Sequence, residues 1–359
     1  MACDPSRHAK DEASLRRLLI LATLLAVLLA AFWLGGETLL ARELRRLDAR
    51  DPTVRIEAVS ELREARRIGV QLSALRLDTP AGRLELPQAD LWLAPLRPTE
   101  IRLNLPAQAL LDLGAGPVTL GLTEAGGRIR LRPLAGGALD SAGLSTGPVT
   151  LDGAPLATSL GVTAALVPTG DDSPPNTMAA YDFALRTDRL DLARLTGGLP
   201  WPGPLQLDAN GRVWLDSAPG PTRLAPGTRP LLIGLRIDRG ELKLGPLAAR
   251  LIGQLRADEQ GRAEGRLALY TPDAAPLLRA AADAGLIPAD AVGPAETVMR
   301  TLGAFPLAAA PGAKGDEAGI AGMVFPAPAP GELRLSLRLA DGRMSLGPVP
   351  LGPAPVFPR

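Results

Sequence analysis

The stretch VTLGLTEAGGRIRL, residues 118–131, decides the fold class of this chain. Apolar residues recur at every second position on both sides of a glycine-containing segment, residues 124–127. These apolar residues are Val118, Leu120, Leu122, Ile129 and Leu131. A period of two directs successive side chains to opposite faces of a β-strand. The stretch therefore predicts an antiparallel hairpin with one apolar face.

The same alternation recurs along the chain from about residue 54. Further alternating apolar residues are Ile101, Leu103 and Leu105 in one stretch and Leu333, Leu335 and Leu337 in another. A glycine that leads into an alternating strand occurs at Gly82, Gly127, Gly211, Gly240 and Gly342. Glycine supplies the positive φ that tight turns need. The chain is thus predicted to be mainly β, with a curved antiparallel β-sheet or β-groove of successive hairpins.

One helical insertion is expected near residues 272–303. Thr271-Pro272-Asp273 resembles a helix N-cap with proline at the first helical position, and a second helix is expected over residues 289–302. Three other segments are rich in proline and glycine and are expected to be loops or disordered. These segments are residues 168–178, 216–230 and 306–331.

Residues 18–36, LLILATLLAVLLAAFWLGG, predict a transmembrane anchor. They contain neither charge nor proline and would span about 28 Å as a helix, enough to cross a bilayer core. The anchor residues include Leu18, Leu24, Leu28, Phe32 and Trp33. Arg16 and Arg17 precede it, so the positive-inside rule keeps residues 1–17 in the cytoplasm. The alternative is a cleaved signal peptide, but the apolar stretch is too long and no small-x-small site follows it.

Leucines at helical spacing follow the anchor in residues 37–53 and predict an amphipathic linker helix. We expect this helix to pack on the next domain, with a position on the membrane surface as the alternative. Residues 54–359 form the predicted exported β-rich domain. We therefore expect a single-pass protein of the bacterial inner membrane, with a cytoplasmic N-terminus and a periplasmic C-terminal domain.

The composition excludes several functional classes. A net charge of +1 and an aromatic content of 3% argue against a nucleic-acid partner. The single cysteine and single histidine, Cys3 and His8, precede the hydrophobic segment, so no intrachain disulfide and no Cys/His metal cluster can form. Phosphate-binding loops of the Walker type and the dinucleotide fingerprint are absent. No cofactor and no metal are expected.

Candidate catalytic residues are few, and the chain is not expected to be an enzyme. Ser145, in Gly143-Leu144-Ser145-Thr146-Gly147, matches the nucleophile-elbow pattern but lacks a histidine partner, so a glycine-rich turn is favoured. Asp171 and Asp172 are interpreted as solvated loop residues rather than calcium ligands. Asp188 and Asp191 are interpreted as solvated partners of nearby arginines, namely Arg186, Arg189 and Arg194.

Two segments carry a family resemblance. LRLSLRLADGRMSLGPVPLGP, residues 333–353, and LWLAPLRP, residues 91–98, resemble segments of an uncharacterised family of alphaproteobacterial envelope proteins, the domain of unknown function twenty-one twenty-five. The anchor and the helical insertion fall in that family's order. The family has no established catalytic residues, so the resemblance implies none. It is in turn similar to the AsmA-like envelope proteins, whose anchored β-sheets curl into an apolar groove associated with lipid movement.

Two functions fit these expectations. The first is binding or transfer of a hydrophobic molecule, such as a lipid or acyl chain, in a groove lined by the alternating apolar residues named above. The second is a non-catalytic envelope scaffold that recruits other envelope proteins through strand edges. A closed apolar core is the alternative to an open groove. The expected partners are the membrane, a lipid or acyl chain, and other envelope proteins.

Overall fold

The computed structural model describes residues 54–64, 67–79, 82–94, 97–114, 116–196, 201–220, 230–283, 288, 290, 292–303, 323, 325–346 and 349–357. The chain divides into two compact units. Unit 1 comprises Met1–Thr163, Thr187–Leu199 and Pro219–Arg229, and unit 2 comprises Ala164–Arg186, Pro200–Ala218 and Pro230–Arg359. Antiparallel strands dominate both units, which confirms the predicted mainly β class.

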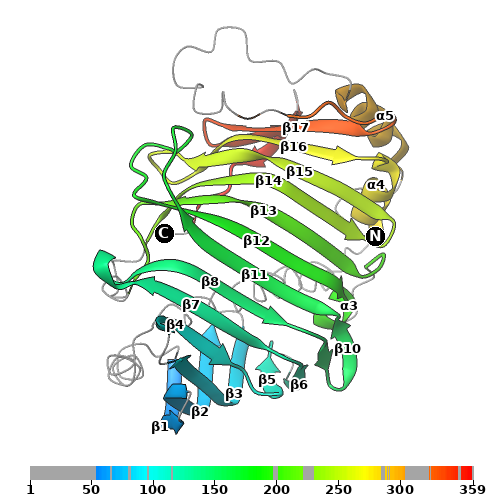
Figure 1. Cartoon of the computed structure of the whole chain (residues 1–359). Coiled ribbons are helices and arrows are strands. Elements are labelled where there is room, and N and C mark those ends of the chain that lie inside the picture. Colours follow the sequence, from blue (N-terminus) through cyan, green and yellow to red (C-terminus); the bar gives the residue numbers. More distant parts are fainter. Residues whose placement is uncertain are drawn as a thin grey trace. The chain divides into compact units, whose positions relative to one another are not determined.

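Unit 1 is built on antiparallel strand pairs (Figure 1). Its strands are β1 (Val54–Glu64), β2 (Arg67–Thr79), β3 (Gly82–Ala94), β4 (Arg97–Asn104), β5 (Gln108–Asp112), β6 (Pro117–Leu122), β7 (Gly126–Arg132), β8 (Ala138–Thr146), β9 (Val149–Leu151), β10 (Ala154–Ala157) and the first part of β11 (Ser159–Val167). β2 pairs with β1 and β3, and β3 pairs with both β4 and β5. β7 and β6 continue the sheet beyond β4 and β5, and they pair in turn with β8 and β9.

A line of interrupted pairing, here called the seam, crosses this sheet. Each of the strand pairs β4/β5, β6/β7 and β8/β9 forms one path along the sheet, broken at residues 105–107, 123–125 and 147–148. The register aligns these breaks, because β4 pairs with β7 on one side and β5 pairs with β6 on the other. In β1, β2 and β3 the seam continues at Glu57, Ala74 and Pro87, where the paired register is interrupted.

The seam changes which residues of a strand face the buried side. In β2 the buried residues are Val70 and Leu72 before the seam and Leu75 and Leu77 after it, so the alternation shifts by one residue at Ala74. Ala74 has a φ of 49°. Strict alternation would turn one of these two apolar pairs to the opposite face. The distortion keeps both on one side of the sheet, the apolar side, and leaves the other as the polar side.

The predicted hairpin over residues 118–131 is wrong. In the described register β6 and β7 pair with other strands: Leu120 lies opposite Ala109 and Leu151, and Ile129 lies opposite Ile101 and Ala142. Glu124, with a φ of 51°, lies in the seam. Residues that favour turns also occur where a strand is distorted. Local composition therefore could not distinguish a hairpin turn from a break within one strand path. The two alternating runs are halves of one strand path.

Three of the five predicted glycine turns are likewise wrong, because these glycines lie inside strands. Gly82 begins β3 and Gly342 separates two strands, as predicted, but Gly127 lies within β7. Gly211 and Gly240 lie inside strands, next to register shifts. A Cβ on Gly211 would lie 1.9 Å from the carbonyl oxygen of Arg236. Close backbone approach at a bulge therefore explains this glycine.

Unit 2 contains a consecutive antiparallel series of strands (Figure 1). This series is β13 (Leu205–Leu215), β14 (Leu232–Leu244), β15 (Leu247–Ala257), β16 (Ala263–Thr271), β17 (Leu333–Ala340), β18 (Arg343–Leu346) and β19 (Val349–Pro353). β12 (Ala179–Leu190) belongs to unit 2 up to Arg186. One core cluster combines Leu255, Ala263, Leu339 and Ala354, and another combines Ile252, Ala268 and Tyr270.

Helices are few in the described residues. α4 (Ala274–Asp283) and α5 (Val292–Gly303) confirm the insertion predicted near residues 272–303, and unit 1 contains α3 (Leu192–Leu195) and the 3-10 turn η1 (Pro133–Ala135). The predicted cap is shifted by two residues. Oδ1 of Asp273 accepts a hydrogen bond from the Ala275 amide at 2.9 Å, whereas Thr271 belongs to β16. The carboxylate thus takes the capping position.

The predicted tail, anchor and linker, residues 1–53, lie outside the described residues. Within the described part of the chain, no helix combines the length and apolarity required to span a bilayer. The predicted loop over residues 168–178 is confirmed, since it contains neither helix nor strand. The predicted loops 216–230 and 306–331 lie partly outside the described residues.

Candidate functional site

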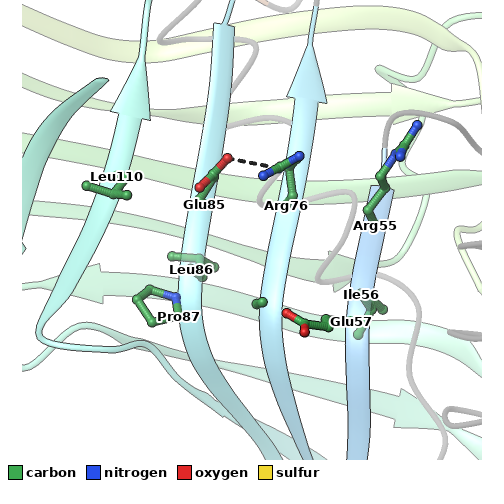
Figure 2. Close-up of a pocket in the computed structure, with 9 residues that line it drawn as sticks. Arg55, Ile56, Glu57, Arg76, Glu85, Leu86, Pro87 and Leu110 are labelled. Carbon is green, nitrogen blue, oxygen red and sulfur yellow. Dashed lines mark ion pairs between the residues drawn. The ribbon is translucent and has the colours of Figure 1, made fainter. Parts of the chain in front are cut away.

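A depression of about 390 Å³ lies on the seam of unit 1. Its lining comes from β1, β2, β3 and β5 (Figure 2). The lining residues are Arg55, Ile56, Glu57, Ala74, Arg76, Glu85, Leu86, Pro87 and Leu110. Because the seam residues Glu57, Ala74 and Pro87 are all among them, the hollow arises where regular pairing is interrupted.

The strand register positions the polar part of this lining. Arg55, Arg76 and Glu85 occupy successive register positions across β1, β2 and β3. Nε of Arg76 lies 2.8 Å from Oε1 of Glu85, as the dashed line in Figure 2 marks. These two charges neutralise each other. Arg55 and Glu57 are exposed at the rim.

The remaining lining is apolar. Ile56 and Leu86 both pair with Leu75 and are buried on the apolar side, whereas 40% of Leu110 is exposed. Leu110 lies opposite Glu85 in the register, so its side chain lies on the polar side of the sheet. The lining contains no serine, cysteine or histidine. Such a surface can hold a molecule with an apolar body and a charged or polar end.

The sequence did not predict this site. Leu110 lies between Ala109 and Leu111, so the local pattern does not show which face Leu110 occupies. Ala109 and Leu111 are buried, and Leu110 is exposed. The other lining residues come together only through the aligned seam. A register across four strands carries no short-range sequence signal.

The groove residues predicted from sequence divide into buried and half-buried sets. Ile101, Leu103, Ile129 and Leu335 are buried. The half-buried set comprises Leu105, Val118, Leu120, Leu122, Leu131, Leu333 and Leu337. In unit 1, Ile101 pairs with Ile129, and Val118 pairs with buried Leu111, which places both pairs on the apolar side. The residues of β17 belong to unit 2. None of the predicted set lines the depression, and their role in a groove stays a prediction.

The polar side of unit 1 also holds a buried carboxylate. Glu100 on β4 lies 3.0 Å from Nε of Arg102 and 3.2 Å from Nη2 of Arg130. Burial alone would raise the pKa of Glu100, but the hydrogen bonds from both arginines, with the charges of Arg102 and Arg97, outweigh it. The pKa of Glu100 therefore lies below its ordinary value, and the carboxylate stays ionised.

Asp172 is not the solvated loop residue that the sequence suggested. It belongs to residues 168–178 of unit 2, here called the strap, and its carboxylate forms an ion pair with Arg236. Nη1 of Arg212 lies 3.9 Å from the same carboxylate. Nε2 of Gln254 donates a hydrogen bond to the Asp172 carbonyl oxygen at 3.4 Å. These contacts hold the strap against β13, β14 and β15.

The other sequence candidates also have structural roles. Ser145 lies within β8 rather than in a turn, which corrects the favoured interpretation and leaves no strand-turn-helix arrangement around it. Asp191 pairs with Arg194 at 3.0 Å as predicted, and it also caps α3. Arg186 pairs with Asp208. Among the described residues there is no group of three potential metal ligands.

Comparison with known proteins identifies one family. The family described as "Uncharacterized protein conserved in bacteria (DUF2125)" matches residues 66–355. No curated protein and no solved structure matches the chain. The family match spans both structural units and the helical insertion. The chain belongs to this family of uncharacterised bacterial proteins.

Proposed function

We propose that this protein is a non-catalytic, membrane-anchored envelope protein that binds or helps to transfer a hydrophobic molecule such as a lipid acyl chain. The depression on the seam carries the proposal. Its volume of about 390 Å³ is at the lower end of the range for small-molecule sites, about 300–1,000 Å³, which suits one chain better than a whole lipid. The analogy with AsmA-like proteins points to the same class of ligand.

The exposed Leu110, with the seam residues Pro87 and Ala74, would contact the chain, and Arg55 would face a carboxylate or phosphate at its end. Removing apolar surface from water gives about 25 cal/mol per Å², so a chain that covers Leu110 and Pro87 gains affinity without any reaction. The predicted N-terminal anchor would keep this site at the periplasmic face of the inner membrane.

Uptake of a fluorescent fatty acid by the full chain tests this function. Leu110→Asp should keep the fold, because Leu110 is already 40% exposed, and should lower uptake by adding a charge to the depression. Leu120→Asp is the matched control, because Leu120 is half-buried on the opposite face of the sheet. Unchanged uptake for Leu110→Asp would contradict the proposed site. A loss in folded Leu120→Asp alone would move the ligand to the apolar side predicted from sequence.

The scaffold function remains the second candidate, and β1, whose described register is with β2, is the strand that favours it. β1 spans Val54–Glu64 without a proline, whereas β19 contains Pro350 and Pro353, which cannot donate to an added strand. Crosslinking in cells that traps partner proteins along β1 would support this function. Recovery of self-contacts alone would argue against it.

A further inference from the structure

Four arginines gather on the polar side of unit 1. Trp92, Arg102 and Arg128 are successive register partners across β3, β4 and β7. Arg130 lies opposite Glu100, two residues further along the same strands. The guanidinium group of Arg67 lies 5.1 Å from the Trp92 ring centroid. We call Arg67, Arg102, Arg128 and Arg130 the arginine patch.

The carboxylates on this face do not balance the patch. Glu64 lies opposite Arg67 in the register, and Glu100 is shared by Arg102 and Arg130. Asp90, the carboxylate nearest along β3 on this face, accepts hydrogen bonds from Gln71 and Gln88. Arg128 is exposed and forms no ion pair within the described part of the chain. In this register four arginines face three carboxylates, Glu64, Asp90 and Glu100, so the patch keeps a net positive charge at neutral pH.

The register makes this excess costly for the folded chain. Arg102 and Arg128 are direct cross-strand partners, and like charges in such positions destabilise a sheet. The side chains of Arg102 and Arg130 remain 43% and 51% exposed, so an external anion can reach both. An anionic partner would offset the repulsion.

Trp92 holds the patch in an extended arrangement. The guanidinium groups of Arg67 and Arg102 lie 5.1 Å and 5.2 Å from the centroid of its ring. Cation–π contacts of this kind restrict two otherwise flexible side chains. Cross-strand spacing of about 4.8 Å then separates neighbouring positions. The result is a row of cations across several strands, which suits an extended anionic surface better than one small anion.

We propose that the arginine patch docks unit 1 onto the anionic headgroups of a phospholipid membrane. This inference rests on the proposed membrane anchor. The predicted linker, residues 37–53, spans at most about 60 Å when extended and about 26 Å as a helix, which keeps β1 near the bilayer. The patch and the rim of the depression share the polar side of one sheet. Docking would thus bring the depression to the lipid surface.

Chemical modification of arginines tests the docking on the full chain. The chain is inserted into nanodiscs of phosphatidylcholine alone, or of phosphatidylcholine with phosphatidylglycerol, and phenylglyoxal modification of each arginine is followed by mass spectrometry. Arg128 and Arg130 should react several-fold more slowly in the anionic discs. Arg186, whose side chain is 74% exposed in unit 2, should react equally in both and serves as the internal control. Equal rates for Arg128 in both discs would overturn the proposal.

Two further arms distinguish headgroup docking from a general effect of charge or of free phosphate. The double variant Arg102→Gln/Arg128→Gln should weaken docking about 30-fold, so that Arg130 is modified in anionic discs as fast as in phosphatidylcholine discs. In Arg83→Gln, modification of Arg130 should still be slower in the anionic discs. The proposal would be overturned if anionic discs slowed modification of Arg130 in the double variant as much as in the wild-type chain. It would also be overturned if dissolved inorganic phosphate slowed modification equally in phosphatidylcholine discs. Co-elution with phosphatidylcholine discs tests the anchor, and fatty-acid uptake tests the depression. Failure of docking can therefore be told from failure of the proposed function.

Discussion

The Glu100 carboxylate offsets the repulsion between its two arginine partners, which lie on neighbouring strands. The side chain of Glu100 is 8% exposed, and its carboxylate contacts both Arg102 and Arg130. Glu100→Gln should lower the free energy of unfolding by about 1–2 kcal/mol, less than for a fully buried pair because both guanidinium groups are partly solvated. Urea unfolding measures this, with Glu85→Gln in the more exposed Arg76 pair as control. Equal losses in both variants would contradict the special role of Glu100.

The same residue predicts a pH dependence. The pKa of Glu100 is lower in the folded chain than its ordinary value. Its contribution to stability is therefore present above the unfolded pKa, about 4.3, and is lost as the pH falls through the folded pKa. The difference between the wild-type chain and Glu100→Gln should shrink as the pH is lowered below about 4. A difference that stays constant from neutral to acidic pH would rule out this linkage.

At the scale of elements, disulfide trapping separates the predicted hairpin from the observed seam. A hairpin closed at residues 124–127 would place Leu120 opposite Leu131, whereas the structure places Leu120 opposite Leu151. In a Cys3→Ser background, Leu120→Cys/Leu151→Cys should crosslink under mild oxidation, because cross-strand partners lie within disulfide range. Leu120→Cys/Leu131→Cys should remain reduced. The reverse result would restore the hairpin.

The strap provides a second test at this scale. A Cβ on Gly234 would lie 2.8 Å from Cγ of Pro174 and 3.0 Å from Cε3 of Trp214, which is fully buried. Gly234→Ala should therefore displace the strap and cost about 1–3 kcal/mol of stability. Gly161→Ala is a matched control, because its nearest heavy atom would lie 4.0 Å away. Thermal unfolding compares the two, and equal midpoints would show that the strap does not pack on Gly234.

Sequence periodicity predicted the strands but not their partners. The alternation around Val118 and Ile129 identified two strand segments correctly, because period two follows from backbone geometry alone. Their pairing depends on residues far away along the chain, such as Leu151 and Ile101. A residue with positive φ, such as Glu124, fits a turn and a strand break equally well. The candidate site required that long-range register, which is why its lining was missed.

At the scale of the whole molecule, the proposed topology requires both units on the same side of the membrane. Arg16 and Arg17 precede the predicted anchor, residues 18–36, and should hold the N-terminus in the cytoplasm. A reporter enzyme that is active only outside the cytoplasm should therefore be active after Arg359, in unit 2, and when inserted at Gly136, an exposed turn of unit 1. Deletion of residues 18–36 should silence both fusions, because the chain would then remain in the cytoplasm. A cytoplasmic reporter that works at either site in the intact chain would exclude the periplasmic location. The proposed lipid site would then not lie at the periplasmic face of the inner membrane, whereas the fold and the family membership would be unaffected.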